Sequence, residues 1–362
     1  DPKWERALDG CLRLDPDAGV ASEVLATEAK FVVDGEITAL PIPDIPSIVR
    51  ATVRRAGYNC RNFDVEVLIQ PQSPDIAEAV QHGEQTAAGD QGIVYGYACS
   101  ETENLLPLPV VLAHRLTALL TCARTMGRIS GLRPDGKAQV SVEYAFGVPR
   151  RISAIVLSRQ HAEDKDLSRL RAELPEFVIQ PALRIFPADE DTEILINPSG
   201  RCGLGGIEAD TGLTGRKLMV DTYGGLAPHG GGALSGKDGT KVDRSGAYMA
   251  RCIAKNIVAA GLAEKCTVAL AYAIGRADPV AVDVDTHLTG TYPDELLEQA
   301  VRCFFGLTPA GMIRTLQLDQ PIFADACNYG HFTRASLPWE QTGQAGKFAE
   351  LCAELERGDD GG

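Results

Sequence analysis

The sequence lacks an apolar run long enough to cross a bilayer, and it lacks any pair of cysteines at Cys-x-x-Cys spacing. Its ten cysteines stand singly, and its six histidines are equally dispersed, without a His-Glu-x-x-His motif. The first residues, DPKWERALDG, show neither the basic nor the apolar region of a secretion signal. These absences argue against a membrane protein, a zinc site and a disulfide scaffold. We expect a cytoplasmic protein with mostly buried, reduced cysteines.

Positive charge is also scarce. Lysine and arginine number 35 against 49 acidic residues, for a formal net charge of −14. This balance argues against nucleic acid as a partner, and any phosphate site must be a local concentration of basic side chains. A length of 362 residues predicts two or three domains.

Hydrophobic periodicity predicts alternating strands and helices. Helices are expected over residues 44–58, 109–127, 246–262 and 293–306. Strands are expected as a pair within 19–38 and over 63–69, 138–144, 151–161, 266–275 and 279–285. Residues 72–92 are typical of a mobile loop, and residues 354–362 of a frayed end. The pattern predicts an α+β fold with helices on one face of mixed sheets, in three blocks of similar rhythm.

The segment HGGGALSGKDGTKVDRS, residues 229–245, combines glycines with lysines and aspartates. Glycine lets backbone N–H groups approach a ligand, lysine can bind a polyanion, and aspartate can hold a cation beside it. Residues 231–237 satisfy the first part of a P-loop, but Asp238 follows where Ser or Thr is needed. An esterase oxyanion loop is also disfavoured, because no Gly-x-Ser-x-Gly elbow exists. We expect a phosphate and metal site of another kind.

Three further glycine-containing segments carry charge: residues 87–92, 132–137 and 212–217. Each alone is typical of a solvated turn. Together with residues 229–245 they favour a phosphate site built from several segments.

The whole chain resembles the methionine adenosyltransferase family, also called S-adenosylmethionine synthetases. The resemblance rests above all on GLTGRKLMVDTYGGLAPHGGGALSGKDGTKVDRSGAYMAR, residues 212–251. Six further segments occur along the chain in the family's order: DPDAGVASEV, QSPDIAEAV, AGDQGIVYGYA, LRPDGKAQV, YAIG and YGHFTRASLPWE.

The resemblance implies three α+β domains related by pseudo-threefold symmetry. On this basis we expect an N-terminal domain over residues 1–81, a central domain over 87–206, a C-terminal domain over 207–345 and a tail over 346–362. It also implies a homodimer that packs sheet against sheet, with active sites at the interface, and dimers that can pair further.

The resemblance implies synthesis of S-adenosylmethionine from ATP and L-methionine. In the family, the methionine sulfur attacks C5′ of ATP and expels tripolyphosphate, which is hydrolysed to pyrophosphate and phosphate. Magnesium, two ions per site, and potassium are the expected cofactors. A catalytically weak homologue, acting as a nucleotide-binding or regulatory subunit, is the alternative.

Site residues carry over by position. The resemblance assigns a catalytic, phosphate-contacting role to Lys137, Arg216, Lys217 and Lys237. It assigns further ATP contacts to Asp90, Asp135, Arg201, Cys202, Asp210, Ala233 and Ile274. It assigns methionine contacts to Glu36, Gln72, Asp210 and Lys241. Asp243 matches a magnesium-binding position and Glu23 the potassium position.

Two positions depart from the family's pattern. Cys202 stands where an aromatic residue packs on adenine, so Ile274 is expected to carry more of that contact. The family's Gly-His-Pro-Asp-Lys motif, with a catalytic histidine and a magnesium-binding aspartate, aligns before Asp1. We expect the natural protein to carry that preceding segment. Among the histidines present, His229 lies in the glycine-rich segment and could approach the phosphates.

Overall fold

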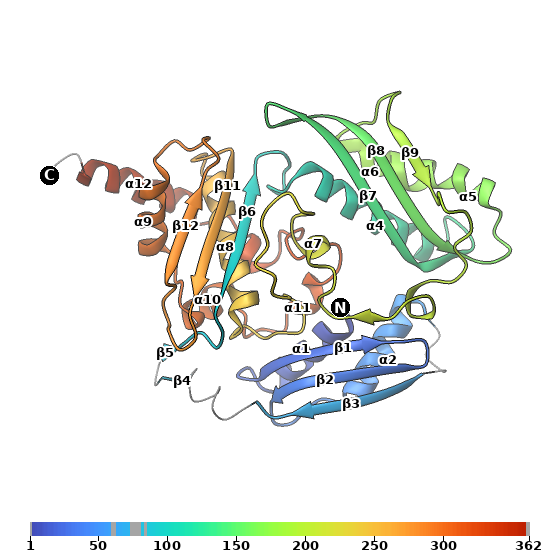
Figure 1. Cartoon of the computed structure of the whole chain (residues 1–362), viewed down its shortest axis with the longest axis horizontal. Helices are drawn as coiled ribbons and strands as arrows, with labels where there is room; N and C mark the ends of the chain where they lie inside the picture. The colour runs from blue at the N-terminus through green and yellow to red at the C-terminus, as the bar shows by residue number, and fades with distance from the viewer. Residues whose placement is uncertain (1, 59–62, 73–80, 83–84, 360–362) are drawn as a thin grey trace.

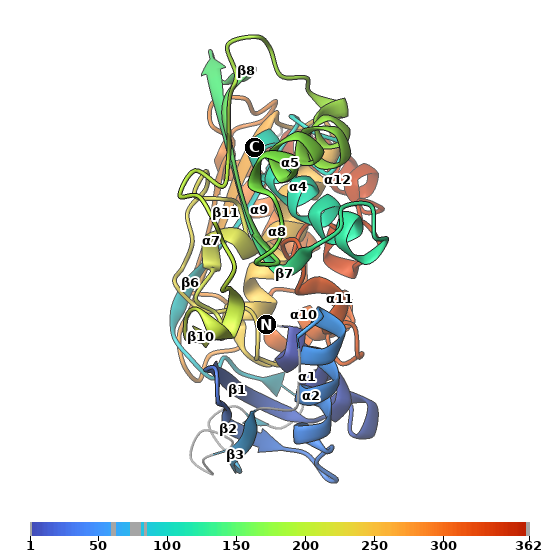
Figure 2. The ribbon, with the colours of Figure 1, turned by 90° about the vertical axis from the view of Figure 1, so that its right-hand side faces the viewer.

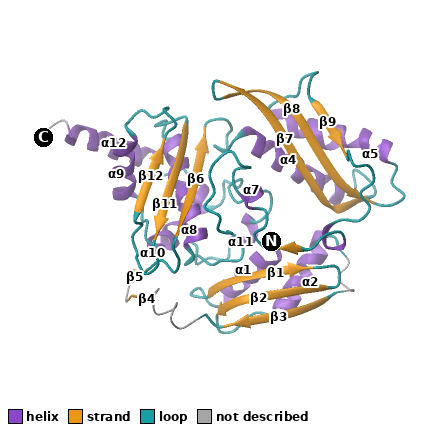
Figure 3. Cartoon of the chain, in the orientation of Figure 1, coloured by secondary structure: helices purple, strands orange, loops and turns teal. Residues whose placement is uncertain are grey.

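The computed structural model describes residues 2–58, 63–72, 81–82 and 85–359. Three sheet-and-helix units surround a centre of short helices and loops (Figure 1). Seen from the side, the sheets lie toward one face, and α1, α2, α4, α5 and α10–α12 lie toward the other (Figure 2). The α+β architecture is confirmed, and Figure 3 shows how helices and strands are divided among the units.

The first unit holds a four-stranded sheet in the order β10-β1-β2-β3. Its strands are β1 (Gly19–Ala26), β2 (Lys30–Thr38), β3 (Asp64–Gln70) and β10 (Gly212–Leu213), and its helices are α1 (Pro2–Leu14) and α2 (Ile45–Ala56). The first two strands are antiparallel, and β2 and β3 are parallel because α2 crosses between them. The expected helix over 44–58 is confirmed: Asp44 accepts a hydrogen bond from Ser47 N at its start, and Gly57 ends it.

The second unit repeats this arrangement with longer strands. It contains α4 (Leu108–Thr125), β7 (Leu132–Ala145), β8 (Val148–His161), α5 (Leu167–Leu174), a π-helical turn (Pro175–Ile179), α6 (Gln180–Ala182) and β9 (Glu193–Ile196). An antiparallel hairpin is again followed by a helical crossover and a parallel third strand. The segment 132–137 therefore opens a strand, and its interpretation as a turn is wrong. Register shifts after Leu132 accommodate Pro134 and Gly136 within that strand.

The third unit combines distant parts of the chain. Its sheet has the order β12-β11-β6 and is antiparallel throughout. The elements are β6 (Gly92–Cys99), α8 (Val242–Ala259), β11 (Lys265–Tyr272), β12 (Ala281–Asp285), α9 (Asp294–Phe304), α10 (Pro309–Leu316) and α12 (Ala345–Asp359). The smaller pieces are β4 (Gln81–His82), β5 (Gln85–Thr86), α7 (Leu218–Asp221) and α11 (Phe323–Ala326). Helix, hairpin and helix thus recur three times, which confirms the rhythm read from the sequence.

Two expectations about local structure are wrong. Helix α8 begins at Val242 rather than residue 246, which places Asp243 in its first turn. The expected frayed end from residue 354 is helical as far as Asp359. Helix α12 is held because Ala345, Phe348 and Cys352, at helical spacing, are buried in the core. Residues 73–80 and 83–84 of the expected loop 72–92 lie outside the described residues, and β4 and β5 pair within it.

The buried side chains form two clusters. One joins the first and third units, and the other fills the second unit between α4, α5 and its sheet. The expected domain boundaries stay a prediction, because β6 and β10 each join a sheet formed mainly by another part of the chain. Six of the nine described cysteines are buried, and all nine are free, as the sequence predicts. Across the described residues, no helix is long and apolar enough to span a membrane.

Candidate active site

A cavity of about 210 Å³ lies between the first sheet and the glycine-rich segment 229–245. It is lined by Ala21, Glu36, Gln72, Gly89, Asp90, Lys237, Lys241, Val242 and Asp243. Six of these nine residues are among those that the sequence assigns to ATP, methionine or magnesium. Residues more than 200 positions apart in the chain are therefore brought together as the resemblance implies.

The glycine-rich segment is fixed because it extends the edge of β1. Ser22 N donates to the carbonyl of Gly236, and Asp238 N donates to the carbonyl of Val20. Lys237 lies opposite Ala21 in this short antiparallel bridge, so the two side chains lie on the same face of the sheet. Gly236 has φ +88°, and a Cβ atom there would lie 2.2 Å from the Ser22 carbonyl oxygen. Only glycine permits this approach.

Asp238, the residue that argues against a P-loop, has a structural role here. Its carboxylate accepts hydrogen bonds from Val20 N at 2.6 Å and from Thr240 N at 2.6 Å. The side chain is buried and ties the turn after Lys237 to the first sheet. A serine or threonine at this position could not accept both hydrogen bonds in the same way.

Asp243 and Lys237 meet in the wall of the cavity. Lys237 Nζ lies 2.5 Å from Asp243 Oδ2, and about a quarter of each side chain is exposed. Asp243 stands in the first turn of α8, where a carboxylate is favoured by the helix dipole. A Cβ atom at Gly232 would lie 2.3 Å from this carboxylate, so the backbone of the glycine-rich segment passes directly over it.

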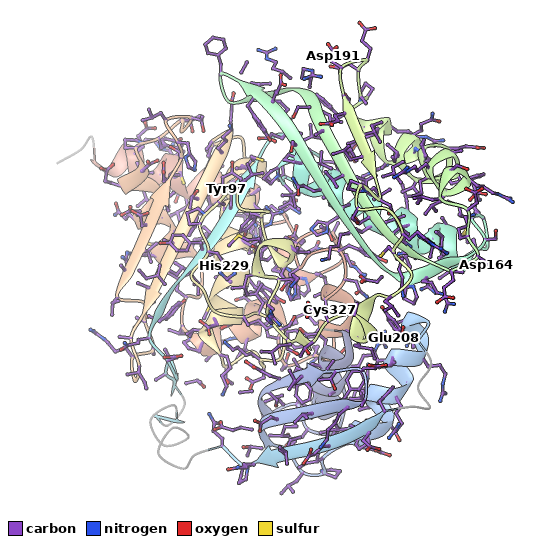
Figure 4. All side chains as sticks on the ribbon, turned by 45° about the vertical axis from the view of Figure 1, so that its right-hand side comes forward. Tyr97, Asp164, Asp191, Glu208, His229 and Cys327 are labelled. Carbon is purple, nitrogen blue, oxygen red and sulfur yellow. The ribbon has the colours of Figure 1, made fainter. Side chains whose placement is uncertain are left out.

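His229 lies on the central loop that passes β6 (Figure 4). It lines a second, small cavity of about 10 Å³ together with Asp243, which lines both cavities. A space of that size holds about one water molecule. Gly231 N donates to His229 Nδ1 at 2.8 Å, which assigns the ring proton to Nε2. Burial lowers the pKa of His229, although Asp243 acts in the opposite direction, so the ring is neutral at pH 7.

Glu23 lies on the same face of β1 as Ala21, which lines the main cavity. Across the antiparallel pair it stands directly opposite Asp34 of β2. Both residues are exposed at this position. Two carboxylates in this relation repel each other unless a cation lies between or beside them.

Four of the sequence-assigned ATP residues belong to the second unit and are not among those lining the cavity. Asp135 and Lys137 lie in β7, where Asp135 Oδ2 accepts a hydrogen bond from Gly206 N at 2.9 Å. Arg201 and Cys202 follow β9, and Cys202 N donates to His161 Nε2 at 3.1 Å. Burial raises the pKa of the Cys202 thiol, Asp135 adds to that rise, and Lys137 opposes it. These residues therefore form a separate group at the open end of the β7–β8 hairpin, where β7 begins and β8 ends.

The remaining assigned residues lie on the segments between the second unit and α8 and in the turn after β11. Asp210, Arg216 and Lys217 are exposed on the segment between the second unit and α7, and Arg216 Nη1 donates to the Thr211 carbonyl at 3.3 Å. Ala233 lies against Gly215, so the two glycine-containing segments touch. Ile274 is 54% exposed in the turn after β11. The described chain does not place these side chains in the main cavity.

Sequence reasoning missed Ala21, Gly89 and Val242 as lining residues, and it missed the role of Asp238. A signal existed for Asp238, because Asp followed by Gly between polar residues is typical of a turn closed by the aspartate side chain. None existed for Ala21, whose place in the site depends on the pairing of β1 with a segment more than 200 residues away.

Comparison with known sequences agrees with this geometry. Residues 5–80 match the S-adenosylmethionine synthetase N-terminal domain, residues 85–202 the central domain and residues 204–341 the C-terminal domain. Together the three matches span most of the chain.

Individual relatives are similar over nearly their full length. A protein named S-adenosylmethionine synthase from Desulforudis audaxviator is 49% identical over 358 residues, covering 93% of this chain and 91% of the relative. One of the same name from Staphylococcus epidermidis is 47% identical over 363 residues, covering 94% and 91%. Another from a Nitratiruptor species is 47% identical over 354 residues, covering 95% and 92%. The chain belongs to the S-adenosylmethionine synthetase family.

Proposed function

We propose that this chain is a methionine adenosyltransferase, which makes S-adenosyl-L-methionine from ATP and L-methionine. The observation that carries the proposal is the 210 Å³ cavity, which is lined by six of the assigned residues: Glu36, Gln72 and Lys241 for methionine, Asp90 and Lys237 for ATP, and Asp243 for magnesium. Family membership supports the same reaction. On the described residues, no observation favours the alternative of a regulatory subunit.

The reaction needs no side-chain nucleophile. A lone pair of the methionine sulfur forms the S–C5′ bond, and the C5′–O bond breaks as its electron pair leaves with tripolyphosphate. Sulfur becomes a sulfonium cation, and negative charge grows on the departing oxygen. Lys237 is fixed at the edge of β1, so it can stabilise this charge without reorganising. In the second step, water cleaves tripolyphosphate to pyrophosphate and phosphate.

The same cavity offers complementary groups for methionine. Glu36 supplies a carboxylate for the α-ammonium group, and Lys241 supplies an ammonium for the α-carboxylate. Gln72 adds an amide, and its own backbone N donates to Thr38 Oγ1 at 3.3 Å, which fixes its place beyond the sheet. Asp210 is the further assigned methionine contact.

Asp243 fits one ligand of a magnesium ion. Among the described residues, no three His, Cys, Asp or Glu side chains gather as a complete metal site. Magnesium typically binds one or two carboxylates and takes its remaining ligands from water and substrate phosphates. A bound magnesium ion, two per site being expected, would neutralise part of the polyphosphate charge. The chain's own part is to hold Asp243 beside Lys237.

Glu23 fits a potassium ion. The facing carboxylate of Asp34 supplies a second hard oxygen ligand on the same sheet face. This position lies two residue pairs along the strands from Ala21 and Glu36, on the same face of the sheet, so the ion would stiffen the wall of the cavity.

We further propose a homodimer in which a second copy completes each site. Four residues that the resemblance assigns to ATP do not line the cavity of their own chain: Asp135, Lys137, Arg201 and Cys202. Strands of the sheets in all three units and two loops also expose large apolar side chains, which an interface of this kind would cover: Leu25, Leu213, Ile93, Ile194, Leu204 and Leu226. We propose the cytoplasm as its location.

The direct test is to incubate the purified chain with ATP, methionine, magnesium and potassium. We expect S-adenosylmethionine, pyrophosphate and phosphate in equal amounts, measured by chromatography and phosphate assay. Binding of ATP and methionine without any product would contradict the proposal and favour the regulatory alternative.

A further inference from the structure

A chain of buried polar side chains lies beneath the glycine-rich segment. Arg244 is fully buried, and its guanidinium donates to Glu5 Oε1 at 2.5 Å, to Tyr248 Oη at 3.1 Å and to the Lys237 carbonyl at 2.7 Å. Tyr248 Oη lies 2.7 Å from His331 Nδ1, and Ser235 Oγ lies 3.4 Å from His331 Nε2. This hydrogen-bonded network begins and ends on the glycine-rich segment, at the Lys237 carbonyl and at Ser235 Oγ.

The direction of these hydrogen bonds follows from the groups involved. Arginine can only donate, so Tyr248 Oη accepts from Arg244 and donates its single hydrogen to His331 Nδ1. The proton of the neutral imidazole is then on Nε2, which faces Ser235 Oγ and, at 4.0 Å, Asp221 Oδ1. Burial holds the pKa of His331 well below its usual range, and the Arg244 charge lowers it further. The imidazole therefore stays neutral and keeps one fixed tautomer.

His331 is the point where three segments meet that carry residues assigned to phosphate or magnesium. Ser235 is two residues before Lys237 on the glycine-rich segment. Asp221, whose carbonyl accepts from His331 N at 2.9 Å, ends the short helix that follows Arg216 and Lys217. Tyr248 is on α8, five residues after Asp243. No other contact described above links all three segments.

We propose that Tyr248 and His331 are positioning residues for tripolyphosphate: they hold Lys237, Lys217 and Asp243 at fixed separations without touching the substrate. The inference rests on the proposed function. Such a network is more directional than apolar packing, because a hydrogen-bonded imidazole accepts few alternative arrangements. Trp339 restricts it further, since its ring stacks on Tyr248 at 3.9 Å and its Nε1 donates to the His331 carbonyl at 2.9 Å.

The inference predicts that removing one hydrogen bond of this network weakens tripolyphosphate binding more than methionine binding. Two of the four methionine-assigned residues, Glu36 and Gln72, belong to the first unit and its following segment, outside this network, whereas Lys241 lies at the start of α8 beside it. A displacement of about 1 Å at a reacting group can cost up to ~10²-fold in rate. If the network were purely structural, a substitution that breaks it would lower the stability of the fold and leave tripolyphosphate binding unchanged.

The test compares Tyr248→Phe with Tyr272→Phe. Each removes one hydroxyl from a buried tyrosine, but Tyr272 Oη donates to the Leu307 carbonyl at 2.8 Å, outside the network. For both variants and the parent we would measure Tm, kcat, the KM for methionine, and the Kd for inorganic tripolyphosphate with magnesium by calorimetry. Tyr248→Phe should lower kcat and raise this Kd, each about tenfold, and change the methionine KM less than twofold. Tyr272→Phe should change kcat and Kd less than twofold.

Equal effects of the two variants on kcat and tripolyphosphate binding would overturn the inference. If Tyr248→Phe does not fold, Ser235→Ala decides, since it removes only the partner of His331 Nε2 and should also weaken tripolyphosphate binding severalfold. Unchanged binding in Ser235→Ala would then overturn the inference. A parent protein that forms no S-adenosylmethionine contradicts the proposed function instead, so the two failures are distinguishable.

Discussion

Lys237 Nζ lies 2.5 Å from Asp243 Oδ2, so the lysine assigned to phosphate and the carboxylate assigned to magnesium form one ion pair in the wall of the cavity. The pair is partly exposed, and its stabilising effect on the fold is therefore small. Its value lies in the site, where a positive charge and a metal ligand are held side by side.

Lys237→Met should lower kcat by ~10²–10³-fold and leave the KM for methionine within a few-fold, because the lysine meets charge that develops as the C–O bond breaks. Lys137→Met should act similarly if a second copy supplies that residue. Steady-state kinetics of product formation measure both, and Lys347→Met, an exposed change on α12, is the control. A raised KM for ATP with parental kcat would mean that these lysines only hold the nucleotide.

Potassium should stimulate the activity, and Glu23→Gln should largely abolish the stimulation, since a neutral amide is a weaker ligand for a hard cation. Asp34→Asn should have the same effect because the two carboxylates face each other across β1 and β2. Activity titrated against potassium, with sodium at equal ionic strength, measures the response. A parental potassium response in both variants would show that the ion binds elsewhere.

Cys202→Phe should tighten ATP binding. Stacking of a base on an aromatic ring is worth roughly 1–3 kcal/mol, which corresponds to a decrease in Kd of roughly five- to 150-fold. Calorimetry with ATP measures the change, and Cys202→Ser, which adds no ring, is the control. Weaker binding in Cys202→Phe would indicate that the pocket is packed around the smaller side chain.

The protein should lose stability on mild acidification through His114. Burial lowers the pKa of His114 to about 4, against the opposing effect of a hydrogen bond to the Val220 backbone. Between pH ~6.5 and ~4 the unfolded state binds a proton that the folded state does not, so stability falls as pH falls, by up to ~1.4 kcal/mol per pH unit.

His114→Gln should flatten this part of the stability profile, measured by denaturant unfolding from pH 4 to pH 8. His287→Gln, at an exposed histidine, is the control and should leave the slope unchanged. The same slope in His114→Gln and the parent would assign the acid sensitivity to other groups.

Phe348→Ala should destabilise the protein by about 3–5 kcal/mol, because it empties a fully buried position on α12. Glu350→Ala, exposed on the same helix, should change stability by less than ~0.5 kcal/mol. Unfolding free energies of the two variants test whether α12 is part of the cooperative fold. Similar small effects would mean that the helix can detach without unfolding the rest.

Local signals predicted the separate elements well. Asp44 and Gly57 mark the two ends of α2, and alternation marks β1, β2 and β8. The site residues came from the resemblance, and the cavity then brought six of them together. Residue patterns alone indicated only phosphate and a metal ion in the glycine-rich segment.

The sequence could not show which distant segments pair. The β-strand that contains Asp135 and Lys137 carries Pro134 and Gly136 near its start, and both residue types are typical of turns; pairing with β8 makes it extended. Helix α12 was missed because its charged outer residues resemble a solvated tail, while its buried face depends on contact with α8 and α9. Both errors arise where tertiary contact overrides local preference.

The docking of Gly236 and Asp238 on β1 has a consequence for the newly synthesised chain. The bond between Val20 and Asp238 spans 218 residues, so β1 leaves the ribosome long before the segment that covers its edge. At ~5–20 residues per second this interval is about 10–40 s. During that time an unpaired strand edge is open to mispairing with other chains. Aggregation during translation, rather than loss of folded stability, is therefore the hazard that slow synthesis or early termination brings to this protein.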